Sequence, residues 1–352
     1  MQAEIDEADA GLLGVLQEAV PFVERPFQAL GERCGLVESD VIRRIRDLKE
    51  RRIIRQISAI FDTRSLGYAS SLVAAKVAPE HLDRAVSVIN AHPGVSHNYL
   101  RNHDFNLWYT IAVPPDSRLG LDGTLAILHA ESGAEMTRAL PTLRLFKIGV
   151  RFDVEGAARP GDQSQPGYTE ANRRACGPLT EQEIRFVRMM QRDLDVTDEP
   201  FVALATSLGM SFAEAAEMHR QFLENGRMRR FAAVLHHRKA GFGANAMGVW
   251  AGPQEDPERL RRLGETMAGF RAVSHCYQRP HYPDWPYNLF TMVHGRSEDQ
   301  CLETLAEISN STGIRDYHAL FSTQEFKKVR VRYFTQDERD WEEQHCQVAN
   351  CG

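Results

Sequence analysis

The pattern of apolar and polar positions near the start of the chain predicts a helix-turn-helix. Val41, Ile45 and Leu48 form an apolar stripe at helical spacing, and Gly35 marks a turn before it. Alternation over residues 53–61 follows, as in a strand that forms a wing. The expected elements are a helix over 8–20, a short helix that opens at Pro26, a turn at 34–36, a helix over 38–52 and a strand over 53–61.

After the wing, the period of the pattern shifts from about 3.6 residues toward about 2. The expected elements are strands over 69–77, 95–101, 105–113 and 143–152, and helices over 80–91 and 119–132. This order, β-α-β-β-α-β, is that of the ferredoxin-like fold. Because both helices cover one side of the antiparallel sheet, its other face is left for a partner or a ligand.

The chain contains this arrangement twice. Pro26 aligns with Pro200, and the alignment continues without a gap through the predicted wing. The motif Val-Ser-His-x-Tyr-x-Arg-x-His begins at Val95 and again at Val273. A repeat of this length indicates a tandem of two related halves.

The two halves predict an α+β protein, a tandem repeat of a winged helix-turn-helix domain followed by a ferredoxin-like domain. Ser211 and Glu214 have the spacing of a helix capping box, which supports the alignment of the second half. The expected parts are a winged helix over 5–61, a ferredoxin-like domain over 62–155, a flexible connector over 156–177, a second winged helix over 178–235, a second ferredoxin-like domain over 236–336 and a C-terminal tail over 337–352.

Composition excludes several classes of protein. The 352 residues carry 42 Lys and Arg against 48 Asp and Glu, a net charge of −6, so the chain is not built for bulk phosphate binding. The six cysteines include no Cys-x-x-Cys pair, which predicts reduced thiols in the cytoplasm. An acidic start and the absence of a long apolar run argue against export and membrane spanning. We find no Walker loop, Rossmann glycine motif or nucleophile elbow.

Each half carries a histidine-rich strand that could form a binding site. Alternate side chains of a strand share a face. One such set is His97, Tyr99, Arg101 and His103, and the other is His275, Tyr277, Arg279 and His281. Arg binds carboxylates in a paired geometry, and His can bind a carboxylate, ligate iron or transfer a proton. The sets suit an anionic ligand, with or without a metal; the alternative is the solvated face of a half-exposed strand.

Residues near these strands add weaker support. Trp108 could stack on a large flat ligand or fill the core. Lys147 and Lys327 are expected on the last strands beside the same surface, where solvated edge charges are the alternative.

The charges of the two helix-turn-helix segments argue against sequence-specific DNA binding. Residues 38–52 carry six basic and four acidic residues, whereas residues 212–226 carry Arg220 against Glu214, Glu217 and Glu224. A helix that reads a DNA groove should not repel phosphate, and paired units normally address two half-sites.

The first half resembles the Lrp/AsnC family, which combines a winged helix with a ferredoxin-like domain. The resemblance lies in the runs 29–36, 42–49, 52–54 and 66–68. The sequence departs from that family at Val37, where its members usually place a Ser or Thr cap. Three further runs, His97 to Thr110, Phe146 to Val150 and His275 to Gly295, resemble the siroheme decarboxylases and are far more specific than the helix-turn-helix.

This resemblance implies an enzyme that removes carbon dioxide from the acetate groups at C12 and C18 of siroheme, giving 12,18-didecarboxysiroheme. It implies a cytoplasmic lyase of two Lrp-like subunits fused in one chain, in haem d1 biosynthesis or in a siroheme-dependent route to haem b. The expected partners are siroheme, a second copy or homologous decarboxylase subunits, with neither DNA nor membrane. No cofactor is expected beyond the iron of the substrate.

The resemblance also suggests roles for the two strands. His97, His103, His275 and His281 are the candidates for iron ligand and proton donor, with the assignment among them open. Arg101 or Arg279 would hold the reacting acetate, Tyr99 and Tyr277 would be supporting donors, and Trp108, Lys147 and Lys327 would contact the substrate. We expect both strands to face one shared cavity. The alternatives are an Lrp/AsnC-type regulator and a tetrapyrrole-binding sensor without catalysis.

Overall fold

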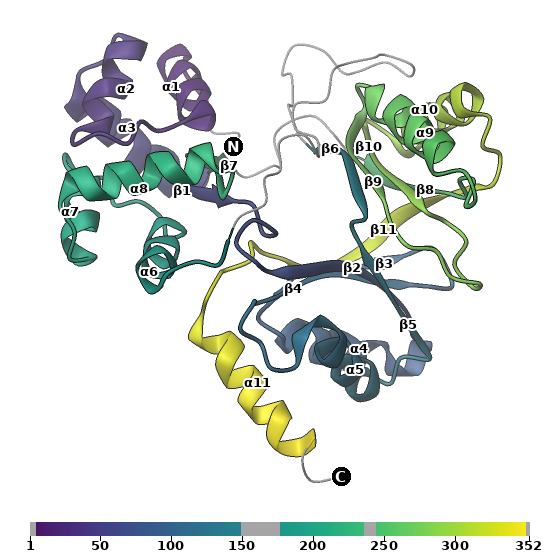
Figure 1. The fold of residues 1–352 in the computed structure, drawn as a ribbon. Helices are drawn as coiled ribbons and strands as arrows, with labels where there is room; N and C mark the ends of the chain where they lie inside the picture. The colour runs from purple at the N-terminus through teal and green to yellow at the C-terminus, as the bar shows by residue number, and fades with distance from the viewer. Residues whose placement is uncertain (1–4, 149–176, 236–243, 350–352) are drawn as a thin grey trace. The chain divides into compact units, whose positions relative to one another are not determined.

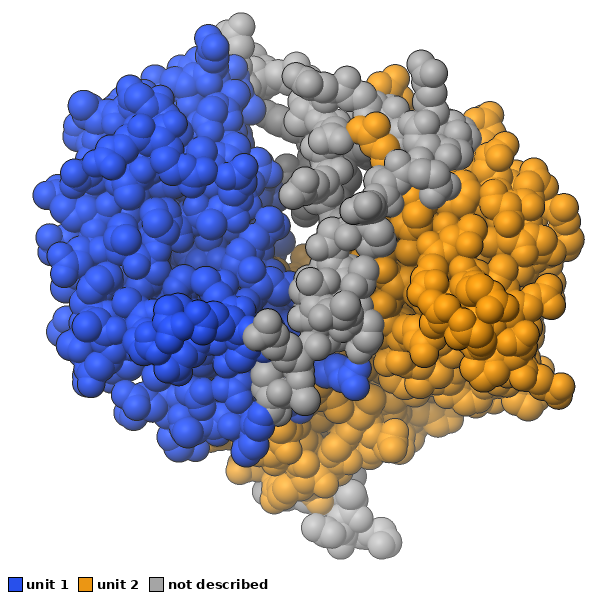
Figure 2. All heavy atoms as spheres, turned by 45° about the horizontal axis from the view of Figure 1, so that its top comes forward, with its two compact units in different colours: residues 1–67, 174–239, 332–335 blue, residues 68–173, 240–331, 336–352 orange. Residues whose placement is uncertain are grey.

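The computed structural model describes residues 5–148, 177–235 and 244–349, which fall into two compact units (Figures 1 and 2). The first unit comprises residues 1–67, 174–239 and 332–335, and the second comprises residues 68–173, 240–331 and 336–352. Each unit takes segments from both halves of the repeat. The predicted connector, 156–177, lies outside the described residues except for its last position.

The first unit contains the two helix-turn-helix segments, each followed by one strand. Its elements are α1 (Glu7–Glu18), α2 (Pro26–Cys34), α3 (Glu38–Glu50), β1 (Ile54–Phe61), α6 (Glu181–Met190), α7 (Pro200–Ser207), α8 (Phe212–Glu224) and β7 (Met228–Leu235). The predicted stripe of α3 is confirmed, because Val41, Ile45 and Leu48 are fully buried. The predicted capping box is confirmed at the start of α8, whereas Val37 gives α3 no side-chain cap.

The two wing strands pair with each other. β1 and β7 form a two-stranded antiparallel sheet in which Ile57 lies opposite Ala233. Backbone hydrogen bonds between the halves therefore join the two winged helices into one unit.

The second unit contains both ferredoxin-like segments and a C-terminal helix. Its elements are β2 (Ala69–Lys76), η1 (Pro79–His81), α4 (Leu82–Ala91), β3 (Val95–Arg101), β4 (Leu107–Val113), α5 (Gly120–Ser132), β5 (Met136–Pro141), β6 (Arg144–Ile148), β8 (Ala244–Trp250), α9 (Pro257–Gly269), β9 (Val273–Gln278), β10 (Leu289–Gly295), α10 (Glu298–Thr312), β11 (Tyr317–Lys328) and α11 (Gln336–Ala349). The predicted β-α-β-β-α-β order is present in both halves, as β2-α4-β3-β4-α5-β5 and as β8-α9-β9-β10-α10-β11.

The halves exchange their terminal strands within one nine-stranded sheet of order β5-β2-β4-β3-β11-β8-β10-β9-β6. β6, from the first half, pairs with β9 of the second. β11, from the second half, pairs with β8 through residues 317–321 and with β3 through residues 322–328. Each half therefore adds a strand to the edge of the other half's sheet.

The last strand of the first half differs from the prediction. A single strand was expected over 143–152, but β5 at Met136–Pro141 closes the first half's own sheet beside β2. The alternating segment that we identified, β6, joins the other half instead. Periodicity predicts that a segment is extended but carries no information on its partner.

Each half packs its helices on one face of its strands and turns the other face toward its counterpart (Figure 1). Ile89 and Leu128 lie in the core under α4 and α5, and Met267 and Leu305 lie in the core under α9 and α10. The opposite faces share a third cluster, the inter-sheet cluster: Ala74, Phe105, Trp108, Leu140, Met247, Val249, Trp285, Tyr287, Phe290 and Leu320. At about 1.5–3 kcal/mol per buried large side chain, this shared layer stabilises the pair substantially.

The C-terminal residues expected as a tail include the helix α11, which packs on the first half. Trp341 joins the core under α4 and α5. Glu342 accepts hydrogen bonds from the Ser117 hydroxyl at 2.5 Å and the Leu119 N–H at 2.9 Å. Among the helices of the described ranges, none is both long and apolar enough to cross a bilayer.

Strand exchange can be tested at Gly264 of α9. A Cβ there would lie 2.3 Å from the ring of Phe146, which β6 brings from the first half. Gly264→Ala should lower the free energy of unfolding by about 1–3 kcal/mol through overpacking. Gly14→Ala is the control, because Gly14 is also helical and has no neighbour within 4 Å. Chemical denaturation in which both variants behave alike would contradict the packing of Phe146 on α9.

Candidate functional site

We call the side chains that were predicted to share one face of each strand a ladder. In β3 the ladder lies on the face that points away from the helices and toward the inter-sheet cluster. His97, Tyr99 and Arg101 alternate with residues that face the helices, such as Asn98, whose amide donates to Asn90 of α4 at 3.0 Å. The rings of His97 and Tyr99 are stacked with centroids 6.1 Å apart.

β9 repeats this arrangement in the second half. His275 and Tyr277 stack with centroids 6.1 Å apart, and Arg279 follows at the same spacing as Arg101. The predicted alternation is present from His97 to Arg101 and from His275 to Arg279. It is wrong for His103 and His281, which we expected on the same strand faces and which lie beyond the ends of β3 and β9.

The two arginines make equivalent contacts across the exchanged strands. One nitrogen of Arg101 donates to the Leu320 carbonyl at 2.8 Å, and one nitrogen of Arg279 donates to the Leu140 carbonyl. The guanidinium carbon of Arg101 lies 5.6 Å from the centre of the Tyr99 ring, and the corresponding distance for Arg279 is 4.7 Å. Each guanidinium is therefore held by a carbonyl of the other half and by an aromatic face of its own strand.

Both arginines are buried without a carboxylate partner. Arg101 is 6% exposed and Arg279 is 9% exposed, and the Nε of each has no hydrogen-bond partner. Burial lowers the pKa of each guanidinium to about 10. Within residues 5–148, 177–235 and 244–349, no Asp or Glu forms an ion pair with either. A buried, uncompensated cation is costly, so these positions suit an anionic ligand.

The predicted substrate contacts other than arginine also have structural partners. Lys147 donates to the Phe270 carbonyl at 2.8 Å, and Lys327 donates to the Asn90 carbonyl at 2.7 Å. Burial lowers the pKa of both lysines. Trp108 is buried in the inter-sheet cluster and donates to the Phe105 carbonyl at 2.6 Å. Their contacts with a substrate stay predictions.

Serine hydroxyls orient the two strand histidines. The Nδ1 of His97 lies 2.9 Å from the Ser96 hydroxyl, and the Nδ1 of His275 lies 2.8 Å from the Ser274 hydroxyl. These contacts help to fix the orientation of both imidazole rings.

His103 and His281 lie beyond their strands, in turns of different length. We call the meeting point of β3, turn 102–106 and the first residues of β11 the first junction. The second junction is the meeting point of β9, turn 279–288 and β5. His103 is half-buried in the first junction, whereas His281 is exposed in the second.

A single hydrogen bond determines which ring nitrogen of neutral His103 carries the proton. The Phe105 N–H donates to its Nδ1 at 3.0 Å, so the neutral ring carries its proton on Nε2. Burial, followed by the nearby His318, lowers the pKa of His103.

Two residues of the first junction were not predicted as site residues. The ring of His318 lies 5.7 Å from that of His103, and the Trp285 ring lies 5.3 Å from it. His318 corresponds in the repeat to Arg138, so comparison of the halves gave no signal for it. Trp285 belongs to the longer turn of the second half, 279–288, and is buried in the inter-sheet cluster.

The two ladders are separated along the sheet. β11, β8 and β10 lie between β3 and β9, and the inter-sheet cluster occupies the layer that both ladders face. The shared cavity that we expected stays a prediction, and we treat the junctions separately.

Comparisons with known proteins agree with this architecture. The AsnC-like ligand binding domain matches residues 65–147 and 239–327, and the siroheme decarboxylase NirDL-like HTH domain matches residues 9–55. A siroheme decarboxylase of Hydrogenobacter thermophilus is 40% identical over 331 residues, 94% of this chain and 96% of that protein.

Of two further relatives, one matches less than half of this chain and the other matches nearly all of it. A siroheme decarboxylase beta subunit of Methanosarcina barkeri is 44% identical over 150 residues, 43% of this chain and 97% of that subunit. The crystal structure of the siroheme decarboxylase NirDL in co-complex with an iron-uroporphyrin III analogue has a TM-score of 0.77 and 34% identity, and covers 97% of this chain and 100% of that one. The predicted resemblance and fold class are confirmed.

The contact between Tyr277 and Arg279 makes a prediction about stability. Tyr277→Leu should lower the free energy of unfolding by about 1 kcal/mol more than Tyr277→Phe, because phenylalanine keeps a ring face beside the buried cation. Chemical denaturation of both variants measures the difference. Equal losses would show that the aromatic face does not stabilise the guanidinium.

Proposed function

The chain belongs to the siroheme decarboxylase family, and we propose that it removes carbon dioxide from the acetate groups at C12 and C18 of siroheme, giving 12,18-didecarboxysiroheme. Decarboxylation breaks a bond between two carbons, so the enzyme is a carbon–carbon lyase. The chain carries both Lrp-like halves, which supports a fused form of the two-subunit enzyme.

The pair of buried arginines carries the proposal. Siroheme is a polycarboxylate, and Arg101 and Arg279 are cations that lack a carboxylate partner among the described residues. Binding a carboxylate would offset the cost of burying each guanidinium, which donates strong charge-assisted hydrogen bonds. The lowered pKa values leave both groups charged near neutral pH.

The chemistry asks the protein mainly for orientation and a proton. Loss of carbon dioxide leaves an electron pair on a carbon next to the conjugated macrocycle, which can delocalise it. The candidates for proton donor and iron ligand are His97, His103, His275 and His281. We propose no cofactor beyond the iron of the substrate itself. The fusion of two subunits favours a place in haem d1 biosynthesis over the siroheme-dependent route to haem b.

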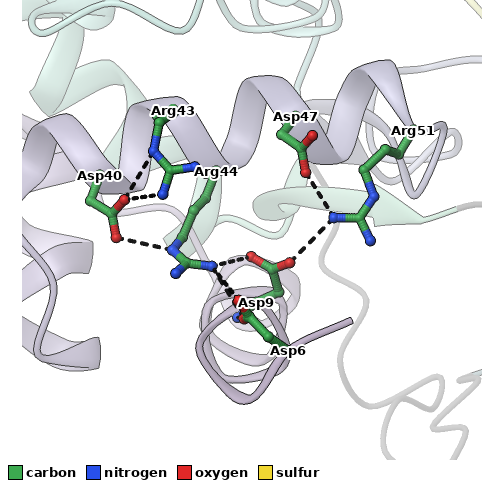
Figure 3. Close-up of polar contacts among 7 residues, drawn as sticks. All are labelled: Asp6, Asp9, Asp40, Arg43, Arg44, Asp47 and Arg51. Carbon is green, nitrogen blue, oxygen red and sulfur yellow. Dashed lines mark hydrogen bonds and ion pairs between the residues drawn. The ribbon is translucent and has the colours of Figure 1, made fainter. Parts of the chain in front are cut away.

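The contacts of α3 argue against the alternative of a DNA-binding regulator (Figure 3). Arg44 forms ion pairs with Asp6 at 2.9 Å, Asp9 at 2.7 Å and Asp40 at 3.0 Å. Arg51 pairs with Asp9 at 3.4 Å. Cations that are already paired with carboxylates gain less from contacting phosphates, so this helix is a weak candidate for groove recognition.

Mass spectrometry of the products tests the activity. Anaerobic incubation of the purified chain with siroheme should give two successive losses of carbon dioxide from the tetrapyrrole. The control is siroheme without protein. Siroheme that is bound, as its absorbance shows, but keeps its mass would contradict the enzyme and favour a tetrapyrrole-binding sensor.

Titration with siroheme tests the arginines. Arg101→Met and Arg279→Met should each raise the dissociation constant at least about tenfold, because a charge-assisted hydrogen bond contributes about 1.5–3 kcal/mol. The matched control is Arg261→Met on α9, which removes an arginine paired with Glu258 and Glu265. Unchanged affinity in both buried-site variants would exclude them from substrate binding.

A further inference from the structure

The two junctions share a common frame. At the first, Arg101 donates to the Leu320 carbonyl of β11; at the second, Arg279 donates to the carbonyl of the equivalent residue, Leu140. Lysines repeat the relation, because Lys147 reaches the Phe270 carbonyl and Lys327 reaches the equivalent His92 carbonyl at 3.2 Å. The two junctions therefore have equivalent contacts with the backbone, and the side chains in which they differ can be compared directly.

In the second junction, side chains of turn 279–288 contact β5 directly. Asp284 accepts two hydrogen bonds from Arg138 of β5, at 3.0 and 2.8 Å. The Tyr282 hydroxyl donates to the Ala139 carbonyl at 2.6 Å, and the guanidinium of Arg138 lies 5.2 Å from the centre of the Tyr282 ring. Asp284 and Tyr282 of this turn therefore both contact the Arg138 guanidinium of β5. His281 is exposed and takes no part in these contacts.

The first junction has an imidazole where the second has that arginine. His318 of β11 corresponds to Arg138, is exposed, and lies beside His103 with ring centroids 5.7 Å apart. Tyr287 packs against His318 at 5.4 Å, and Trp285 packs edge-on against His103 at 5.3 Å. The longer turn of the second half therefore supports both imidazoles of the first junction.

The hydrogen bond from the Phe105 N–H separates the chemistry of the two imidazoles. With Nδ1 accepting that N–H, neutral His103 presents an Nε2–H donor and no lone pair for iron. His318 is exposed to solvent at the edge of the first junction, and an imidazole can act as a proton donor.

We propose that the first junction is the reactive one: His103 holds the reacting acetate carboxylate through its Nε2–H, and His318 delivers the proton to the carbon that loses carbon dioxide. This inference rests on the proposed function. The bond between the methylene carbon and the carboxylate carbon breaks, carbon dioxide leaves, and the electron pair stays on the methylene carbon. The proton of the His318 imidazolium forms the new C–H bond, and water returns a proton to the neutral ring. One proton is consumed per acetate, and no oxidant is needed.

Single-turnover decarboxylation of bound siroheme, with siroheme affinity measured separately, tests the assignment. His318→Ala should slow the loss of carbon dioxide at least about 100-fold with affinity within about twofold of wild type, since a positioned proton donor contributes about 100-fold or more. Added imidazole should restore part of the rate, because position 318 is open to solvent. If the role of His318 were purely structural, added imidazole would not restore the rate of the His318→Ala variant.

Two variants of His103 separate its chemistry from its role in the turn. His103→Asn keeps an acceptor for the Phe105 N–H, and His103→Gln places an amide near the position of Nε2. We expect His103→Asn to lower both affinity and rate about tenfold or more, and His103→Gln to recover part of the loss. His281→Asn, at the equivalent position of the second junction, tests whether that junction reacts instead. The matched control is His129→Asn on α5, a half-buried histidine that belongs to neither junction, which should stay within about twofold of wild type.

The outcomes distinguish this inference from the function on which it rests. An active wild type with a slow His281→Asn and wild-type rates for the other variants would assign the chemistry to the second junction and overturn the inference. Wild-type rates in every variant would overturn it as well. A wild type that binds siroheme and releases no carbon dioxide would instead refute the proposed function.

Discussion

The second compact unit, which contains the nine-stranded sheet, depends on the exchange of strands between the two halves. β6 completes the sheet beside β9, and β11 continues from β8 onto β3. Backbone N–H and C=O groups of a buried strand need partners, and among the described strands β6 and the last residues of β11 find theirs only on the other half. The same exchange brings the carbonyls of Leu140 and Leu320 to the arginines of the opposite half. The candidate site is thus a product of pairing and belongs to neither half separately.

This construction couples stability to ligand binding. Arg101 and Arg279 are buried as cations, which opposes folding, and the carbonyl and aromatic contacts compensate only part of that cost. An anion that binds them in the native state shifts the equilibrium toward that state. Sites with this character need not be the most stable arrangement of their residues, because they are completed by the ligand.

Local features of the fold could be predicted from the sequence, and long-range ones could not. The stripe of α3, the cap at Ser211 and the bounds of β3 follow from spacing along the chain. The pairing of β1 with β7 and of β6 with β9 depends on residues far apart in sequence, which periodicity does not describe. The same limit applies to the site. The ladders were predictable as faces of strands, whereas His318 reaches His103 only because β11 crosses to the first half.

The pairing of β1 and β3 with strands of the second half has a consequence for synthesis of the chain. Both strands leave the ribosome before β7 and β11, so their hydrogen-bonding edges are exposed until the rest of the polypeptide emerges. Unpaired edges are templates for aggregation. A chain whose second half is still being synthesised therefore carries strand edges whose native partners do not yet exist.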